Sequence, residues 1–309
     1  MTDTKILILG YSSFIKRRVI PSLKKNKKIK YCICSESNKI NKRKKILFNN
    51  YNISLKKFKP NIVYISKINS LHYKFAKMTL NKGFNTIVDK PATLNLKQTK
   101  ELLKIAKTKK LFFAEATLFN YHRVFKSIKK LYRDINEVEH IQSNFNIPFY
   151  KSPNELKIKK NDCEADMSPY AASIIRLFLK GKINKLNVYK NYFKGTKLVK
   201  SFYIIASINK LTYFGNFAFQ RNYDQQIIFY TKDKTIYSPK RIFAQPSHIN
   251  SLVIIKTKNK IKKIMVKKDD CIDNFFKLVL NTLRKKNYEY FYNMILKDSK
   301  IRNIITKFN

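Results

Sequence analysis

The sequence predicts an α/β protein, with a doubly wound parallel sheet followed by an α+β domain whose sheet is largely antiparallel. Short apolar runs alternate with amphipathic helical patterns from Lys5 to about Leu118. Polar and charged residues gather where those runs end, at one edge of the predicted sheet. Beyond residue 120 the pattern changes to alternating strands joined by short turns. We therefore expect a first domain at residues 1–120 and a second at residues 121–309.

The first predicted strand, Lys5 to Leu9, runs directly into Gly10 and a helix over about residues 14–24. A strand, a glycine turn and a helix make up a dinucleotide-binding (Rossmann) unit, in which backbone N–H groups hold the pyrophosphate. Only the first glycine of that pattern is present, because Ser12 and Ile15 stand where the other two belong. The loop alone is equally compatible with an ordinary strand-to-helix turn.

The second strand, Lys30 to Cys34, is followed by Ser35 and Glu36, where such a unit carries the acid that binds the ribose. Glu36 could accept the ribose hydroxyl or lie on the surface, and which of Ser35 and Glu36 faces the adenosine stays open. A carboxylate here repels a 2′-phosphate, so the position favours NAD over NADP.

Three more strands complete the predicted sheet, at residues 61–66, 86–88 and 111–116. The first is followed by Asn69 to His72, which open a helix. The second is followed by Asp89, Lys90 and Pro91, and then by a helix that Asn95 can cap. The loops at residues 10–15, 66–72 and 88–91 therefore share one edge of the sheet, where open α/β sheets bind ligands.

The second domain begins with a helix from Arg123 and a strand from Val138. We expect a helix to open at Asp166 to Tyr170, with Ser168 as its N-cap and Pro169 in its first turn. Strands of alternating polarity follow, among them a hairpin over residues 252–266 with its turn at residues 258–259, and two helices at residues 272–284 and 288–307 end the chain.

Charge is the most extreme feature of the composition, with 66 Lys and Arg against 19 Asp and Glu, a net +47. This alone points to nucleic acid or an anionic membrane. The lysines are spread along the whole chain, however, and there are only five glycines, as in a sequence of biased composition. We therefore interpret the charge as a solvated surface, and expect no specific nucleic-acid partner.

Other classes of protein are disfavoured by what the sequence lacks. The sequence contains no uninterrupted run of about 18 apolar residues, so we expect no membrane span. The N-terminus is predicted to begin a strand rather than a signal peptide. Four scattered cysteines do not make a disulfide framework, and Cys32 and Cys34 read as buried thiols rather than as a metal pair. We expect a cytoplasmic protein without a metal site.

In order along the chain, these motifs resemble the glucose–fructose oxidoreductase, inositol dehydrogenase and rhizopine-catabolism (Gfo/Idh/MocA) family. Lys90 and Pro91 match its Glu-Lys-Pro signature, with Asp89 in place of Glu. Asp166 and Tyr170 match its Asp-x-Gly-x-His/Tyr signature, with Ser168 in place of Gly. Residues 241–246 look like the Arg-Ala-Phe-x-Pro-Pro segment of members that act on nucleotide-linked keto-sugars.

The resemblance implies an NAD(P)-dependent oxidoreductase that transfers a hydride between nicotinamide and a sugar or nucleotide-linked sugar. Tyr170 would exchange the hydroxyl proton, with Lys90 as the cation that a phenol of ordinary pKa about 10 needs to act as a base, and Asp166 would orient Lys90 or the substrate. A homodimer or homotetramer is also implied. The alternatives are a non-catalytic nucleotide-binding relative and a polyanion-binding protein.

The predicted cofactor-binding residues all follow the carboxyl ends of strands. They are Gly10, Ser12, Ser13, Phe14, Ile15, Ser35, Glu36, Ser66, Asn69, His72, Asp89, Lys90 and Pro91.

Overall fold

The computed structural model describes residues 3–37, 40–133, 138–148, 153–159, 161–179, 185–239 and 241–308. The chain divides into two compact units, residues 1–117 with 272–299, and residues 118–271 with 300–309. The predicted division had one boundary, at residue 120. In the structure residues 272–299 return to the first unit, so both units are built from two separate stretches of the chain.

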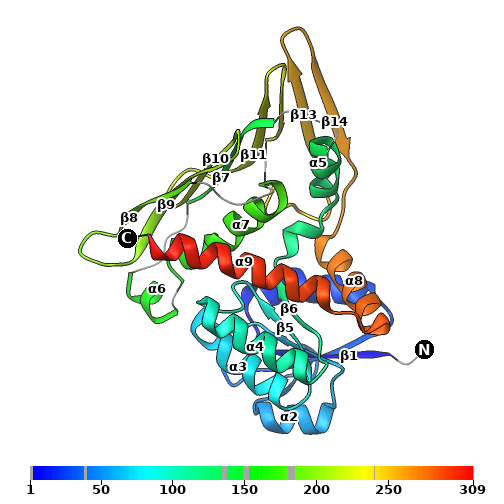
Figure 1. Ribbon diagram of the computed structural model, residues 1–309. Coiled ribbons are helices and arrows are strands. Elements are labelled where there is room, and N and C mark those ends of the chain that lie inside the picture. Colours follow the sequence, from blue (N-terminus) through cyan, green and yellow to red (C-terminus); the bar gives the residue numbers. More distant parts are fainter. Residues whose placement is uncertain are drawn as a thin grey trace. The chain divides into compact units, whose positions relative to one another are not determined.

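The first unit contains a six-stranded sheet in the order β3-β2-β1-β4-β5-β6. Figure 1 labels β1, β5 and β6 of this sheet. Every pair of neighbouring strands in the sheet is parallel. The strands are β1 (Thr4–Leu9), β2 (Ile29–Cys34), β3 (Ile46–Phe48), β4 (Ile62–Ile65), β5 (Asn85–Asp89) and β6 (Phe113–Ala116). This is the strand order of a dinucleotide-binding sheet, whose order reverses beside β1. The predicted doubly wound parallel sheet is confirmed.

Helices cover both faces of this sheet, which is why most residues of its strands are buried. One face packs in a single cluster with α2 (Tyr51–Phe58), α3 (Asn69–Asn81), α4 (Leu96–Thr108) and part of α9 (Glu289–Lys307). The other face includes Tyr64, whose ring lies 6.1 Å from that of Phe276 in α8 (Cys271–Lys285). Asn95 caps α4 as predicted, since its side chain accepts a hydrogen bond from the Gln98 N–H.

Two local features of this unit were not predicted. Strand β3 and helix α2 lie between β2 and β4, where the sequence showed no clear period. The helix after Gly10 is wider than an α-helix at η1 (Ile15–Val19) and continues as α1 (Ile20–Lys25). In this π-turn the Ile20 N–H bonds the Ile15 carbonyl, immediately before Pro21, which has no N–H for the usual pattern.

The second unit contains an eight-stranded sheet in the order β14-β13-β12-β11-β7-β10-β9-β8. Its strands are β7 (Val138–Ile147), β8 (Lys185–Tyr192), β9 (Val199–Ile208), β10 (Leu211–Phe219), β11 (Asp224–Thr231), β12 (Lys234–Ser238), β13 (Ser251–Thr257) and β14 (Ile261–Val266). Only β7 and β10 pair in parallel. The predicted largely antiparallel sheet is therefore confirmed. The unit's helical segments are η2 (Leu118–Tyr121), α5 (Arg123–Arg133), α6 (Pro153–Lys159) and α7 (Cys163–Phe178).

The start of α7 differs from the prediction. The helix begins at Cys163 and its N-cap is Asp162, which accepts a hydrogen bond from the Ala165 N–H at 3.0 Å. The other oxygen of Asp162 accepts from the Val199 N–H of β9, also at 3.0 Å. Ser168 is therefore not a cap, and Pro169 lies inside the helix. An aspartate that bonds two backbone groups defines the start of the helix more strongly than a serine nearly two turns later.

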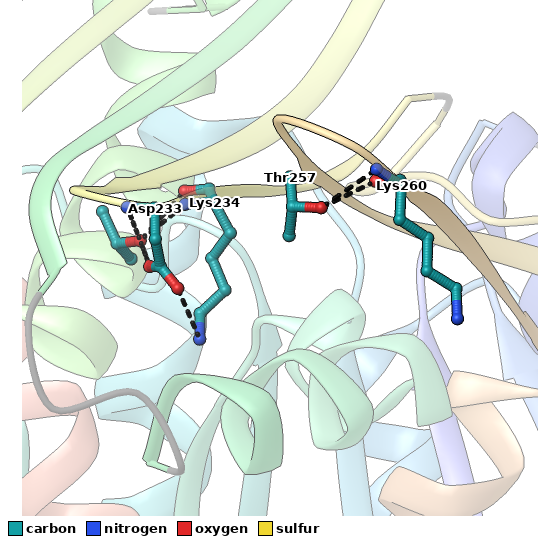
Figure 2. A network of polar contacts seen from close by, with 5 residues as sticks. Asp233, Lys234, Thr257 and Lys260 are labelled. Atoms are coloured by element: carbon teal, nitrogen blue, oxygen red, sulfur yellow. Dashed lines mark hydrogen bonds and ion pairs between the residues drawn. The ribbon is translucent and has the colours of Figure 1, made fainter.

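Two hairpin turns of this sheet are built alike (Figure 2). The Thr257 hydroxyl accepts from the Lys260 N–H at 3.1 Å, and the Thr231 hydroxyl accepts from the Lys234 N–H at 3.0 Å. The hairpin β13–β14 has lysines at 256, 258, 260, 262 and 263, and two more follow it at 267 and 268. Since β14 is the last strand in the sheet order, lysines there also discourage pairing with a further strand.

Across the described ranges, none of the helices combines the length and the apolar composition needed to cross a membrane.

A buried ion pair ties the first turn of α7 to β8. The Lys190 ammonium lies 3.0 Å from a Glu164 carboxylate oxygen, and the two side chains are 6% and 11% exposed. The ammonium also donates to the Thr306 carbonyl near the end of α9, at 3.3 Å. Burial raises the pKa of the Glu164 carboxyl, and the Lys190 charge opposes that shift. Glu164 therefore depends on Lys190 to remain charged in this position.

Replacing Lys190 by Met is expected to lower the free energy of unfolding by about 3–5 kcal/mol, because a buried carboxylate loses its partner. Urea denaturation measures this, with Lys185→Met on the exposed side of the same strand as the control. The double variant Glu164→Gln/Lys190→Met should recover most of the loss, since no unpaired charge is then buried. A loss no larger than that of the control contradicts the role of the pair.

Candidate cofactor site

Gly10 lies between β1 and the helix that follows, at the point where the strand order reverses. Its φ is +106°, and a Cβ on it would lie 2.1 Å from the Ser66 carbonyl oxygen. Only glycine fits, because the backbone after β4 approaches too closely for a methyl group. The Gly10 N–H donates to the Cys34 carbonyl at 2.9 Å, which joins this turn to the end of β2.

A chain of hydrogen bonds connects the ends of β1, β4 and β5. The Ile15 N–H donates to the Ser12 hydroxyl at 3.2 Å, and the Ser12 and Ser66 hydroxyls are 2.9 Å apart. The Ser66 hydroxyl donates to an Asp89 carboxylate oxygen at 2.5 Å. Since Ser66 gives its only proton to Asp89, it accepts from Ser12, and all the donors in the chain point the same way.

Tyr64 completes this network from the side of β4. Its ring is fully buried, and its hydroxyl donates to the second Asp89 oxygen at 2.5 Å. Burial raises the pKa of the Asp89 carboxyl, while the hydrogen bonds from Ser66 and Tyr64 act in the opposite direction. Burial and the Asp89 charge raise the pKa of Tyr64, which keeps the phenol protonated and donating. Asp89, predicted as a cofactor ligand, therefore holds the phosphate loop in place.

His72 and Glu115 both hold the peptide group that joins Pro91 to Ala92. The two ring nitrogens of His72 lie 2.7 Å from the Pro91 carbonyl oxygen and 2.9 Å from the Lys67 carbonyl oxygen, and the side chain is buried. The Ala92 N–H donates to Glu115 at 2.7 Å. Both ring nitrogens of His72 face backbone carbonyls, so the side chain joins the loop after β4 to the loop after β5. Asn69 begins the same helix and is also buried.

The end of β2 has one buried and one exposed polar residue. Ser35 is 1% exposed, whereas the Glu36 side chain is 60% exposed and lies 3.9 Å from the Lys67 ammonium. Cys32 and Cys34 are fully buried, as predicted, and burial raises the pKa of the Cys32 thiol to about 12. Between Ser35 and Glu36, only Glu36 presents its side chain to solvent.

The residues present fit the pyrophosphate of a dinucleotide. The helix after Gly10 starts at Ser13 and Phe14, and the N–H groups of a first turn have no acceptor within the helix. Phe14 is 36% exposed, while Ile15 is fully buried and gives its N–H to Ser12. Ser13 and Phe14 would therefore hold the pyrophosphate through their backbone, and Ile15 serves the core.

The second group of predicted residues lies on α7, in the other unit. Asp166 and Tyr170 are one turn apart and both are half-buried. The Tyr170 ring stacks on Phe119 with centroids 5.0 Å apart, and meets Phe145 edge-on at 4.6 Å. Phe243 contacts the same ring at 5.4 Å. Rings from η2, β7 and the segment after β12 therefore fix the orientation of Tyr170.

The sequence interpretation missed three residues of this region. Tyr64 reads as one of a run of core residues, although a tyrosine in a fully buried strand needs a hydrogen-bond partner. Asp162 was not recognised as a cap, although an acid followed by a helical pattern is a usual start signal. Lys67 gave no signal, because it is one lysine among many.

Residues 4–117 match the family model of GFO_IDH_MocA, described as an oxidoreductase family with an NAD-binding Rossmann fold. The matched residues contain the whole parallel sheet and the loops described above. The predicted residues on α7 lie outside the match. Residues 4–117 belong to the Gfo/Idh/MocA oxidoreductase family. The predicted resemblance is confirmed, and this part of the chain has the family's NAD(P)-binding fold.

Curated relatives match over part of their length. A trans-1,2-dihydrobenzene-1,2-diol dehydrogenase of Xenopus tropicalis is 24% identical over 147 residues, which is 47% of this chain and 44% of the relative. A scyllo-inositol 2-dehydrogenase (NADP(+)), IolU, of Bacillus subtilis is 30% identical over 83 residues, 27% of this chain and 25% of the relative. The chain therefore aligns with less than half of each relative.

The similarity in fold to a solved protein extends beyond the matched residues. The 3-ketoreductase KijD10 of Actinomadura kijaniata, solved with NADP and TDP-benzene, superposes with a TM-score of 0.92 at 16% identity. The match covers 99% of this chain and 98% of KijD10. At this identity the likeness establishes the fold of both units, and no more.

Replacing Gly10 by Ala is expected to be about 1–3 kcal/mol more destabilising than replacing Gly195 by Ala. Both glycines have positive φ, +106° and +70°, so both variants carry the backbone penalty of that region. A Cβ on Gly195 would meet nothing within 4 Å, whereas one on Gly10 would collide with Ser66. Chemical denaturation of the two variants measures the difference, and equal losses would contradict the close approach.

Proposed function

We propose that this protein is an NAD(P)-dependent oxidoreductase that transfers a hydride between nicotinamide and a carbon of a sugar or nucleotide-linked sugar. The observation that supports this most is the loop at Gly10, built at the reversal of a β3-β2-β1-β4-β5-β6 sheet. There the first-turn N–H groups of Ser13 and Phe14 are placed for a pyrophosphate. The nicotinamide, when bound, supplies or accepts the hydride.

The protein's residues would manage the proton that accompanies the hydride. In reduction, the Tyr170 phenol gives its proton to the carbonyl oxygen as that oxygen becomes a hydroxyl. In oxidation, the phenolate takes the proton back. The Lys90 ammonium would stabilise the phenolate, and Asp166 would orient Lys90 or the substrate.

The packing around these residues suits such roles. Pro91 is held through its carbonyl by His72, and the next N–H is held by Glu115, so the backbone that presents Lys90 has little freedom. Tyr170 is held by three aromatic rings that pack against its own ring. Groups fixed in this way lose little entropy when they bind a substrate.

The substrate class comes from the relatives. The two curated dehydrogenases are named for a dihydrodiol and an inositol, which are cyclic compounds with neighbouring hydroxyl groups. KijD10 is named as a 3-ketoreductase and was solved with TDP-benzene. We infer a ring carbon that carries a hydroxyl or keto group, with a polyol or a nucleotide-linked sugar as the substrate.

Replacing Tyr170 by Phe should lower kcat by about 10²- to 10⁴-fold and leave NADH and NADPH binding nearly unchanged, because only the exchangeable proton is lost. Nicotinamide fluorescence measures binding, and absorbance at the reduced nicotinamide band measures turnover with a panel of inositols, hexoses and nucleotide-linked sugars. Tyr189→Phe, on an exposed strand position, is the matched control. Retained turnover in the Tyr170 variant would overturn its assignment.

The same assays separate the two alternatives. A non-catalytic relative binds a cofactor and shows no hydride exchange with any member of the panel. A polyanion-binding protein binds nucleic acid with an affinity that falls steeply with salt but persists at physiological ionic strength.

We also propose that the second unit pairs with a copy of itself through the face of its sheet opposite α7. Two adjacent rows of uncharged side chains cross four strands on this face, and the charged residues that contact them, Arg221 and Asp224, are of opposite sign. The two rows are Ile205, Phe214, Gln142 and Ile228, and Tyr203, Asn216, Asn144 and Gln226. In a chain of net charge +47, such a face is where two copies can approach with little repulsion.

Replacing Phe214 by Lys should convert a dimer or tetramer to smaller species, because two like charges would meet across a symmetric contact. Sedimentation velocity at physiological ionic strength measures this. Ile53→Lys, at a residue of α2 that is 47% exposed, is the control. A wild-type protein that sediments as a monomer would contradict the proposed interface.

A further inference from the structure

The side chain of Lys67 takes an unusual course, which bears on the proposed cofactor site. Lys67 follows Ser66 at the end of β4, yet its ammonium lies 2.6 Å from the Tyr51 hydroxyl and 3.9 Å from a Glu36 carboxylate oxygen. Its Cδ would lie 3.3 Å from a Cβ placed on Gly10. The side chain therefore passes over the glycine turn of β1 and places its charge at the end of β2.

Aromatic packing fixes the ammonium in this position. It lies 5.0 Å from the centre of the Tyr51 ring and 5.5 Å from that of Phe75, and these two rings meet edge-on. The Lys67 side chain is only 18% exposed, compared with 60% for Glu36. Burial and the nearby Glu36 carboxylate raise the pKa of Tyr51, so its phenol stays neutral and its oxygen can accept from the ammonium. Such a lysine is preorganised, unlike a solvated surface lysine.

This position matters because the end of β2 is where the adenosine ribose of a dinucleotide lies. Glu36 alone would accept the ribose hydroxyls of NAD and repel the 2′-phosphate of NADP. With the Lys67 ammonium beside it, the local charge of the pair is zero. Of the three N–H donors of the ammonium, the Tyr51 oxygen takes one, which leaves donors for a phosphate oxygen.

We propose that Lys67 is a cofactor-specificity residue, which binds the 2′-phosphate of NADP so that the protein accepts both NADP and NAD. The inference rests on the proposed dinucleotide site. It revises the preference for NAD over NADP that the Glu36 carboxylate suggested. Charge complementarity supports it, because a 2′-phosphate beside Glu36 needs a cation within a few ångströms.

The test is a titration of NADH and NADPH, monitored by nicotinamide fluorescence at fixed ionic strength, with the full-length wild type and variants. Lys67→Met keeps the apolar stem and removes the charge. It should weaken NADPH binding by about tenfold or more and NADH binding by less than about threefold. Lys67→Arg should retain NADPH binding. Lys82→Met, at an exposed position after α3, is the control for the loss of one positive charge.

The outcomes distinguish the possible failures. Equal weakening of both cofactors by Lys67→Met means that Lys67 only supports the loop, and it overturns the inference. So does a wild type that binds NADH and excludes NADPH. A wild type that binds neither cofactor refutes the proposed function itself. If Lys67→Met does not fold, weakened NADPH binding with nearly unchanged NADH binding in Lys67→Gln, with circular dichroism unchanged, supports the inference in its place.

Discussion

The first unit depends on a carboxylate, that of Asp89, which is shared by two hydroxyl donors at the ends of parallel strands. Tyr64 and Ser66 both donate to Asp89, and through Ser66 the network reaches Ser12 and the turn at Gly10. Each of these groups would be costly to bury alone, because an unpaired polar group loses its hydration. Together they fix the distance between β1, β4 and β5, and hence the shape of the phosphate loop.

This network also changes the meaning of the motif around Lys90. In the sequence, Asp89, Lys90 and Pro91 form one signature, which suggests three residues with one purpose. In the structure Asp89 faces the network and Pro91 is held by His72, so two of the three position the third. On α7, Asp162, Glu164 and three aromatic rings play a similar part for Tyr170. Around Lys90 and around Tyr170, most of the neighbouring groups therefore serve to position the side chain that we propose to be reactive.

The lysines of this chain differ in how much their charge contributes to the folded structure. Most lysines are exposed, and such charges contribute little to stability because water and salt screen them. Lys190 and Lys67 are exceptions, since their side chains are only 6% and 18% exposed and each lies beside a carboxylate. Composition alone cannot reveal such residues among 66 basic ones. Burial and a fixed partner distinguish them, and both are properties of the folded chain.

The sequence by itself determined most strands and helices and the cap at Asn95, because these follow from local periodicity and backbone conformation. Only the tertiary structure decided which polar groups meet. Tyr64 and Asp89 are 25 residues apart, and Lys67 and Tyr51 are 16 apart. Their contacts depend on strand order and on the reach of each side chain across neighbouring strands. The same reason explains why residues 272–299 were not assigned to the first unit, since their packing against its sheet involves partners far away in the chain.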